Sequence, residues 1–346
     1  MAFQRAIILA SRGGPLTLTA KHPVTEPQER QLQIKVTVTA LNGHDQKIRD
    51  LGIFIDRIGL PAVLGNDVVG RVVKQGSRIT RFKEGDRILS QADFSRGTPQ
   101  NGLQDYAVFD EDFAIKIPEN TSDDDAATLP TNVIASLVAL FHDLPIPAPW
   151  TPQAKTFDYK GSSLLVVGGG SIAGRYAVQL ARLAGIGRII VIGGAQEELK
   201  QYGATHVLDR HLDRDRLLSQ VRAVVQDELI YAFDAVNFPD GQILALDALS
   251  TSKKGYLARL IPMPIDQSKV KNKNAVFELK NTLGISSEHP GLCIEFWKRL
   301  EGYLEQRIII PVQGYRILNG LSVDTISETL DSFRDSQILK HVHFHH

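Results

Sequence analysis

One strand–turn–helix segment in the middle of the chain constrains the fold more than any other feature. Four consecutive apolar residues, Leu164–Val167, run directly into the glycine-rich stretch Gly168–Gly174, and a helical pattern follows over Tyr176–Ala184. Backbone N–H groups and the helix dipole converge at such a turn, and glycines let an anionic phosphate approach it. This context favours a dinucleotide-binding turn over a plain strand–helix connection.

Two registers of a glycine fingerprint fit the turn, each with three small residues. They are Gly168, Gly170 and Ala173 in the first register, and Gly169, Ser171 and Gly174 in the second. The residues expected to hold the cofactor come from the turn and the start of the helix: Gly169, Gly170, Ser171, Ile172, Ala173 and Gly174.

The middle of the chain continues to alternate between strand and helix. Apolar strands are expected at Ile189–Ile192, Leu229–Phe233 and Gly255–Leu260, with a helix at Glu197–Tyr202. Strands that are apolar throughout and separated by helices form a parallel sheet covered on both faces. The first third differs, because alternating polar and apolar residues such as Leu32–Ala40 predict the short strands of a barrel or sandwich.

The residues after the second apolar strand bear on which dinucleotide the turn would bind. An acidic side chain at this position binds the ribose hydroxyls of NAD. Here Ile192 is followed by Gly193-Gly194-Ala195-Gln196, and the first carboxylate is that of Glu197. This leaves room for a 2′-phosphate, with Lys200 or Arg210 as its cation. We therefore expect NADPH rather than NADH.

Length and composition predict a cytosolic protein of two domains. The chain has 346 residues, of which 43% are hydrophobic, and its 39 basic side chains balance its 39 acidic ones. This length exceeds the usual size of one hydrophobic core. The charge balance argues against a nucleic-acid partner bound through bulk charge. Neither a signal-peptide pattern nor an apolar stretch of membrane-spanning length is present, so no membrane association is expected.

The cysteine and histidine content predicts no metal site. Cys293 is the only cysteine and lies in the helical pattern Gly291–Leu300, where a buried, unreactive residue is expected. The C-terminal tract His341–His346 is interpreted as a strand, Ile338–Val342, that runs into a purification-tag remnant, with a short metal-binding tract as the alternative. No function is assigned to this tract.

Five segments resemble the medium-chain dehydrogenase/reductase superfamily, specifically its zinc-free branch of quinone reductases and fungal enoyl reductases. They follow the family's order and span nearly the whole chain: Pro61–Ile88, Ala126–Phe141, Leu164–Gly185 (LLVVGGGSIAGRYAVQLARLAG), Tyr202–His211 and Phe233–Asn237. The resemblance implies an α/β protein. A GroES-like β-rich domain would take residues 1–126 and 291–346, and a Rossmann domain with a doubly wound parallel sheet would take 127–290.

The resemblance also favours the second register of the turn, in which Ser171 departs from the family's middle glycine. Homodimers are common in the family and usually join near the strand Leu257–Leu260, so a homodimer is a candidate assembly.

In zinc-dependent members of the superfamily, a cysteine and a Gly-His-Glu segment supply ligands of the catalytic metal. By resemblance, the matching positions here are Asn42 and, after Gly65, Asn66-Asp67. An amide is a poor replacement for a thiolate or imidazole at a tetrahedral zinc site. The expected enzyme is therefore zinc-free, and its substrate must be activated by conjugation, as in an enone, a quinone or an enoyl thioester.

The resemblance assigns roles to residues of the loop and helix near the nicotinamide. Asn42 is expected to donate a hydrogen bond to the developing oxyanion, and Asp45 to brace the loop. Phe54 stands where the branch often has a tyrosine, so another proton donor is needed. His44 and Lys47 are both within sequence reach, and the sequence does not choose between them.

Three residues of the Rossmann segment complete the candidates. Asn132 and Ser136 belong to a helix that faces the nicotinamide phosphate or ribose in relatives, although the family more often has Thr-Ala where this chain has Ala135-Ser136. Asn237 is expected at the carboxyl edge of the sheet, where ligands bind, and is equally well explained as an ordinary loop asparagine.

These observations together predict an NADPH-dependent reductase that acts on an activated C=C or C=O of a small-molecule substrate. Aldehyde reduction and trans-acting enoyl reduction for a polyketide synthase are alternatives within enzymes. A cofactor-binding protein with a structural or regulatory role is the alternative outside them.

Overall fold

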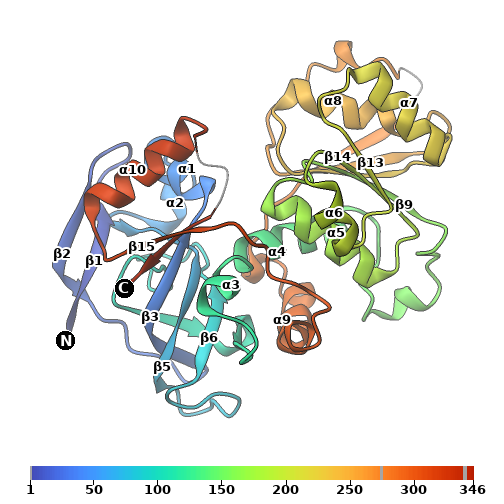
Figure 1. The fold of residues 1–346 in the computed structure, drawn as a ribbon. Helices are drawn as coiled ribbons and strands as arrows, with labels where there is room; N and C mark the ends of the chain where they lie inside the picture. The colour runs from blue at the N-terminus through green and yellow to red at the C-terminus, as the bar shows by residue number, and fades with distance from the viewer. Residues whose placement is uncertain (1, 273–275, 338–340) are drawn as a thin grey trace. The chain divides into compact units, whose positions relative to one another are not determined.

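The computed structural model describes residues 2–272, 276–337 and 341–346, and Figure 1 traces their course. The chain divides into two units. A β-rich unit comprises residues 1–131, 285–307 and 311–346, and a parallel-sheet unit comprises 132–284 and 308–310. The resemblance implied boundaries at 126/127 and 290/291, and nothing in the sequence indicated that 308–310 joins the parallel-sheet unit.

The β-rich unit contains two sheets, one with the strand order β2–β1–β4 and a larger one with the order β15–β16–β3–β5–β6–β8, in which β7 also pairs with β3. Alternate residues of β3, namely Leu32, Ile34 and Val36, point into one buried cluster, as the alternating sequence pattern predicts. The strands are β1 Phe3–Leu9, β2 Leu16–Pro23, β3 Gln31–Leu41, β4 Ala62–Val63, β5 Asp67–Gln75, β6 Arg87–Gln91, β7 Tyr106–Asp110, β8 Ala114–Lys116, β15 Arg316–Asn319 and β16 Val342–His345. The helices are α1 Gly43–Leu51, α2 Ile55–Ile58, α3 Asp123–Ala127, α9 Pro290–Glu305 and α10 Val323–Arg334, with short turns η1 Glu111–Phe113 and η5 Ser286–Glu288.

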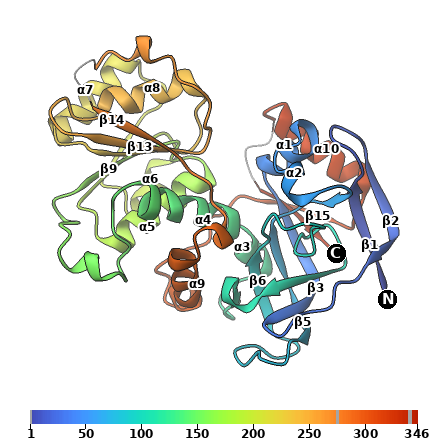
Figure 2. The same ribbon diagram turned by 180° about the vertical axis from the view of Figure 1, so that it is seen from behind.

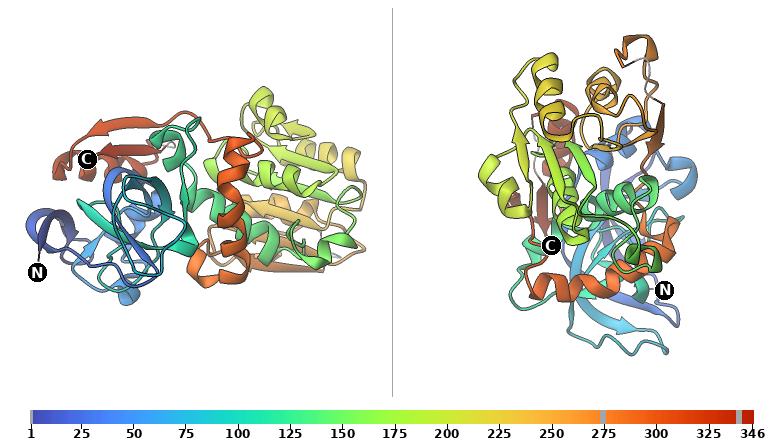
Figure 3. Two further views of the ribbon diagram at one scale, coloured as in Figure 1. Left: turned by 90° about the horizontal axis from the view of Figure 1, so that it is seen from below. Right: turned by 90° about the vertical axis from the view of Figure 1, so that its right-hand side faces the viewer.

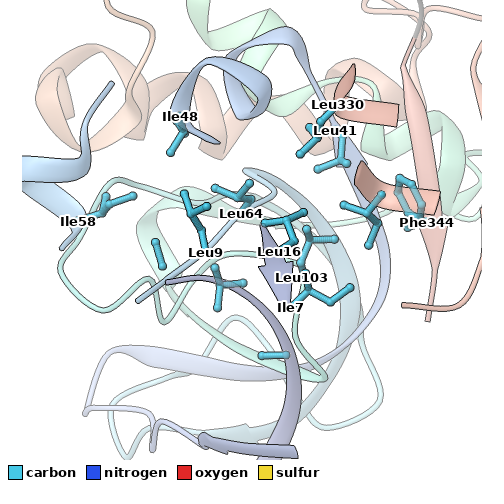
Figure 4. Close-up of a cluster of buried hydrophobic side chains, with 14 of the residues drawn as sticks. Ile7, Leu9, Leu16, Leu41, Ile48, Ile58, Leu64, Leu103, Leu330 and Phe344 are labelled. Atoms are coloured by element: carbon cyan, nitrogen blue, oxygen red, sulfur yellow. The ribbon is translucent and has the colours of Figure 1, made fainter. Parts of the chain in front are cut away.

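A cluster of buried apolar side chains joins the two ends of the chain beneath α1. Leu9 of β1, Ile48 of α1, Leu330 of α10 and Phe344 of β16 all belong to it (Figure 4). Seen from behind, α10 lies beside α1 (Figure 2). Arg49 of α1 also donates from Nη2 to Oδ1 of Asp331 at 2.6 Å. These contacts hold α1, and therefore the loop that precedes it, in a fixed place.

The C-terminal histidines are structural residues of the larger sheet. Strand β16 pairs with β3 and with β15, and the red strands run side by side in Figure 3. Nδ1 of His343 and Nε2 of His345 lie 2.8 and 2.9 Å from the same carboxylate oxygen of Asp124. Nε2 of His346 lies 3.0 Å from Oγ1 of Thr39. The strand interpretation therefore holds for Val342–His345, whereas most of the expected range Ile338–Val342 lies outside the described residues.

The parallel-sheet unit has one six-stranded sheet in the order β11–β10–β9–β12–β13–β14. All adjacent strands in it run parallel. Helices α5 and α6 lie on one face, and α7 and α8 lie on the other (Figure 1). The strands are β9 Ser163–Val167, β10 Arg188–Ile192, β11 His206–Leu208, β12 Tyr231–Asp234, β13 Gly255–Arg259 and β14 Phe277–Asn281. The helices are α4 Pro130–Val138, which starts at the boundary between the units, α5 Ile172–Ala184, α6 Gln196–Tyr202, α7 Arg214–Val225 and α8 Pro239–Ala248, with short turns η2 Ala139–Asp143, η3 Pro152–Lys155 and η4 Gln267–Lys269.

This strand order is that of a doubly wound sheet, and it confirms the predicted α/β fold class. The order reverses between β9 and β12, and ligands of such sheets bind outside the carboxyl ends of the strands at this point. Cys293 is buried in α9, as expected, and burial raises the pKa of its thiol to about 12. Within the described ranges, none of the helices combines the length and the apolar character needed to cross a bilayer.

Candidate functional site

The predicted site residues form two groups, one in each unit, and each group is described by itself. In the β-rich unit, the group surrounds the start of α1, where Asn42 is the N-cap. The fully buried carboxylate of Asp45 accepts the backbone N–H of Asn42 at 2.8 Å and that of Gly65 at 2.9 Å. The expectation that Asp45 braces the loop is confirmed.

A second buried carboxylate holds the Asn42 side chain. Nδ2 of Asn42 donates to Oδ2 of Asp67 at 2.7 Å, and Oδ1 of Asp67 accepts the backbone N–H of Thr131 at 2.7 Å. Burial raises the pKa of Asp67 to about 6, and the hydrogen bonds from Thr131 and Asn42 oppose that rise. An ionised carboxylate can only accept, so it requires the nitrogen of the Asn42 amide to face it. An oxyanion role for Asn42 would then use the other N–H of that nitrogen.

Asn66, the residue before Asp67, contacts the ring of His44. Nε2 of the ring lies 3.0 Å from Oδ1 of Asn66 and 3.6 Å from Oδ2 of Asp45. Asn66 is itself buried and donates from Nδ2 to the carbonyl oxygen of Ala92 at 2.9 Å. The structure therefore brings Asn42 and His44 together through the adjacent residues Asn66 and Asp67.

Aromatic rings line one side of His44. The ring of Phe94 makes an edge contact with His44 at 6.3 Å between centroids, and Phe54 stacks on Phe94 at 4.2 Å. Phe54 therefore packs against a neighbouring ring where the branch often has a tyrosine. Phe94 was not identified from the sequence. Lys47 lies on the same helix as His44, and burial lowers the pKa of its amine.

The positions that match zinc ligands in relatives carry amides that are committed to hydrogen bonds. Asn42 donates to Asp67, and Asn66 donates to Ala92 and accepts from His44. This donor set does not fit a tetrahedral zinc ion, which takes thiolate, imidazole or carboxylate ligands. Among the residues that the structure describes, no three His, Cys, Asp or Glu side chains are grouped to hold a metal ion.

In the parallel-sheet unit, the turn after β9 excludes a side chain at Gly168, where φ is +91°, and also at Gly169 and Gly174. A Cβ on Gly169 would lie 2.1 Å from Cγ1 of Val191, and a Cβ on Gly174 would lie 2.3 Å from the carbonyl oxygen of Gly168. Both distances are far below van der Waals contact. Gly169 and Gly174 are the first and last positions of the second register.

Ser171, at the middle position of that register, is the N-cap of α5. Its hydroxyl accepts the backbone N–H of Gly174 at 3.0 Å and donates to the carbonyl oxygen of Gly168 at 2.8 Å. In the part of the unit that the structure describes, three backbone N–H groups of the turn make no hydrogen bond. They belong to Gly170, Ile172 and Ala173. These groups form the cradle that would bind a phosphate.

The residues at the end of β10 lie against this turn. A Cβ on Gly194 would lie 2.8 Å from the backbone nitrogen of Gly170, so Gly194 lacks a side chain for a packing reason that is independent of cofactor choice. The stem of Arg210 packs over Gly193, with Cδ 3.4 Å from the place of a Cβ there. Lys200 instead lies 3.9 Å from a carboxylate oxygen of Glu197 on its own helix.

The remaining candidates have structural partners. Asn237 donates from its backbone N–H and from Nδ2 to the buried carboxylate of Asp234, at 2.8 and 2.9 Å, and so shapes the turn after β12. The hydroxyl of Ser136 in α4 lies 2.7 Å from the carbonyl oxygen of Ala173 in α5, to which it donates. Ser136 is fully buried and joins two helices, so its side chain does not face a ligand.

Comparison with known proteins identifies similar chains. Residues 28–119 match the alcohol dehydrogenase GroES-like domain family. The chain is 32% identical to the dehydrogenase orsE of Emericella nidulans over 285 residues, which cover 77% of this chain and 80% of that protein. It is 31% identical to the trans-enoyl reductase tazE of Aspergillus terreus over 269 residues, which cover 75% of this chain and 86% of the other.

Solved structures show the same fold across the whole chain. The CurK enoyl reductase superposes with a TM-score of 0.76 at 17% identity and covers 99% of both chains. The mycobacterial protein Rv1454c, solved in complex with NADPH, superposes with a TM-score of 0.74 at 20% identity and covers 99% of this chain and 100% of its own.

A GroES-like β-rich unit, together with a doubly wound unit that carries a glycine-rich turn, defines the chain as a two-domain oxidoreductase. More narrowly, the chain belongs to the medium-chain dehydrogenase/reductase superfamily, as the sequence resemblance indicated.

Substitution of Gly174 tests the phosphate cradle. Gly174→Ala forces α5 away from the Gly168 carbonyl, so we expect the dissociation constant for NADPH to rise at least about tenfold, equivalent to about 1.4 kcal/mol. Fluorescence titration measures this constant. Gly291→Ala, in the first turn of α9 where an added Cβ meets nothing within 4 Å, is the matched control and should bind normally. Unchanged binding by Gly174→Ala contradicts the assignment.

The raised pKa of Asp67 predicts a pH-dependent contribution to stability. The folded state binds the Asp67 proton more tightly than the unfolded state, so this contribution is present at low pH and is lost as pH rises through about 6. Thermal unfolding of the wild type and Asp67→Asn should show that the variant gains relative stability between pH 5 and 7.5. The comparison removes the contributions of ionisable groups that do not interact with Asp67, because both proteins contain them. A melting-temperature difference between the wild type and Asp67→Asn that is constant with pH contradicts a pH-dependent contribution from Asp67.

Proposed function

We propose that this protein is a zinc-independent, NADPH-dependent oxidoreductase that reduces an activated C=C or C=O of a small molecule. The observation that carries the proposal is the hydrogen bond from Asn42 to Asp67. At a position where zinc-dependent relatives have a metal ligand, this chain has an amide whose nitrogen is committed to a buried carboxylate. An amide held in this way offers an N–H donor for an oxyanion.

The parallel-sheet unit would bind the cofactor through its own backbone. The N–H groups of Gly170, Ile172 and Ala173 would donate to the pyrophosphate at the start of α5. Arg210, whose stem packs over Gly193 at the end of β10, would pair with the 2′-phosphate. Bound NADPH would supply the hydride. The NADPH complex of the similar mycobacterial protein supports this cofactor.

The β-rich unit would supply the polar groups that act on the substrate. When a conjugated acceptor takes a hydride, negative charge moves to its oxygen, and the N–H of Asn42 would stabilise that charge. His44, which is partly exposed beside the ring of Phe94, would provide the proton.

Among activated acceptors, an enoyl thioester is the first choice. Two of the similar proteins already described are named as enoyl reductases, the one of Aspergillus terreus and CurK. Quinones, enones and aldehydes share the need for an oxyanion donor and are the other acceptors to test.

A substrate screen tests the proposed activity. NADPH oxidation should accelerate with at least one member of a panel of enoyl thioesters, enones, quinones and aldehydes. On the active substrate, Asn42→Ala should lower kcat about 100- to 1,000-fold, because one oxyanion donor is lost. Asn319→Ala, an exposed asparagine of β15, is the control and should keep full activity. If NADPH binds but no member of the panel is reduced, the enzymatic proposal fails.

The choice of cofactor can be tested at Arg210. Arg210→Ala should weaken NADPH binding about tenfold and leave NADH binding unchanged, because a charge-assisted contact to the 2′-phosphate is lost. Lys200→Ala is the control, since Lys200 already lies beside Glu197. Fluorescence titrations with both cofactors measure the effect. Equal losses for NADH and NADPH, or a larger loss in Lys200→Ala, would overturn this assignment.

A further inference from the structure

We infer that Asn66 and Asp67 are positioning residues that together fix where the hydrogens of His44 and Asn42 lie. The catalytic meaning of this inference rests on the proposed function, but the hydrogen positions themselves can be measured without it. The two residues are adjacent and each contacts one of the two candidate side chains, at 3.0 and 2.7 Å.

The orientation of the Asn66 amide follows from its second contact. Its Nδ2 lies 2.9 Å from the carbonyl oxygen of Ala92, which can only accept a hydrogen bond. The other end of the amide, Oδ1, must therefore face His44. Because Oδ1 also only accepts, Nε2 of His44 must carry a hydrogen, and the carboxylate of Asp45 at 3.6 Å favours the same arrangement.

This arrangement determines how His44 can deliver a proton. In the neutral ring Nε2 is protonated and Nδ1 is the basic nitrogen. The substrate can therefore take a proton only from Nδ1 of the doubly protonated ring. The transfer breaks the Nδ1–H bond, forms a C–H or O–H bond on the substrate that has received the hydride, and leaves neutral His44 with Nε2–H intact. Solvent then returns a proton to Nδ1.

Asp67 orients the side-chain amide of Asn42, just as Asn66 orients the ring of His44. Its carboxylate accepts from Nδ2 of Asn42, so the amide cannot turn its oxygen toward Asp67 while Asp67 is ionised. The backbone around Asp67 is held on both sides, because Asp67 pairs with Ala40 of β3 and with Gln91 of β6. Asp67 is thus fixed in a strand that is paired on both sides, and Asn42 and His44 lie on the loop and first turn of α1 beside it.

Nuclear magnetic resonance of the ring nitrogens tests the part that concerns His44. In protein labelled with ¹⁵N-histidine above pH 8, His44 should show a protonated Nε2 and an unprotonated Nδ1, and Hε2 should exchange slowly with water. The spectrum of His44→Gln identifies the His44 signals. In Asn66→Ala the Hε2 signal should be lost to exchange. A wild-type ring protonated on Nδ1 overturns the inference.

A control variant separates this effect from general loosening of the unit. Asn101 is another buried asparagine of the β-rich unit, and within the described residues its Oδ1 has no hydrogen-bond partner. Asn101→Ala should leave the Hε2 signal of His44 intact. Equal loss of the signal in Asn101→Ala and Asn66→Ala would assign the effect to loosening and contradict a specific role for Asn66.

Kinetics test the part that concerns Asp67. With the active substrate at pH 8, Asp67→Asn should lower kcat at least about fivefold with KM changed less than about twofold, because the Asn42 amide can then turn over while the site keeps its shape. An unchanged kcat contradicts the role of Asp67. The hydrogen position and the activity are tested separately. A protonated Nε2 without turnover of any substrate would retain the arrangement at His44 and reject the proposed function. Turnover by a protein whose His44 is protonated on Nδ1 would retain the proposed function and reject that arrangement.

Discussion

The candidate site of the β-rich unit depends on the carboxylate of Asp45. It accepts the backbone N–H groups of Asn42 and Gly65, and so joins the loop before α1 to a segment that lies 20 residues from Asp45 in sequence. This link adds to the pairing of Asp67 with Ala40 of β3, which brings Asn66 and Asp67 beside Asn42 and His44. The carboxylate of Asp45 also stabilises the N-terminus of α1, where a negative charge is favourable.

Burying the carboxylates of Asp45 and Asp67 in one small site costs free energy. A charge removed from water is expensive unless hydrogen bonds replace its hydration. Asp45 receives two backbone N–H groups, and Asp67 receives one backbone and one side-chain donor. The pKa of Asp67, raised to about 6, shows that its compensation is incomplete. The apolar cluster beneath α1 must offset this cost, and Ile48 joins that cluster to the helix.

Local signals in the sequence were sufficient for the parts of the fold that depend on neighbours in the chain. The apolar run before Gly168 predicted β9, the turn and α5, and the alternation of Leu32–Ala40 predicted β3. Strand β14 gave no such signal, because its residues are half-buried at a sheet edge. Similarly, the sequence identified Asn66-Asp67 only as a place that lacks zinc ligands. Their hold on His44 and Asn42 arises from the pairing of β5 with β3 and β6.

The glycines after β10 show why a missing side chain is a weaker guide to specificity than a side chain that is present. From the sequence, Gly193-Gly194 indicated NADPH because no acid occupies these positions. In the structure Gly194 packs against the backbone of Gly170, and a side chain of any kind would collide there. Its identity therefore follows from packing. A preference for a 2′-phosphate would have to come from a group that can bind one, and Arg210, whose stem covers Gly193, is better placed for this than Lys200, which lies beside Glu197.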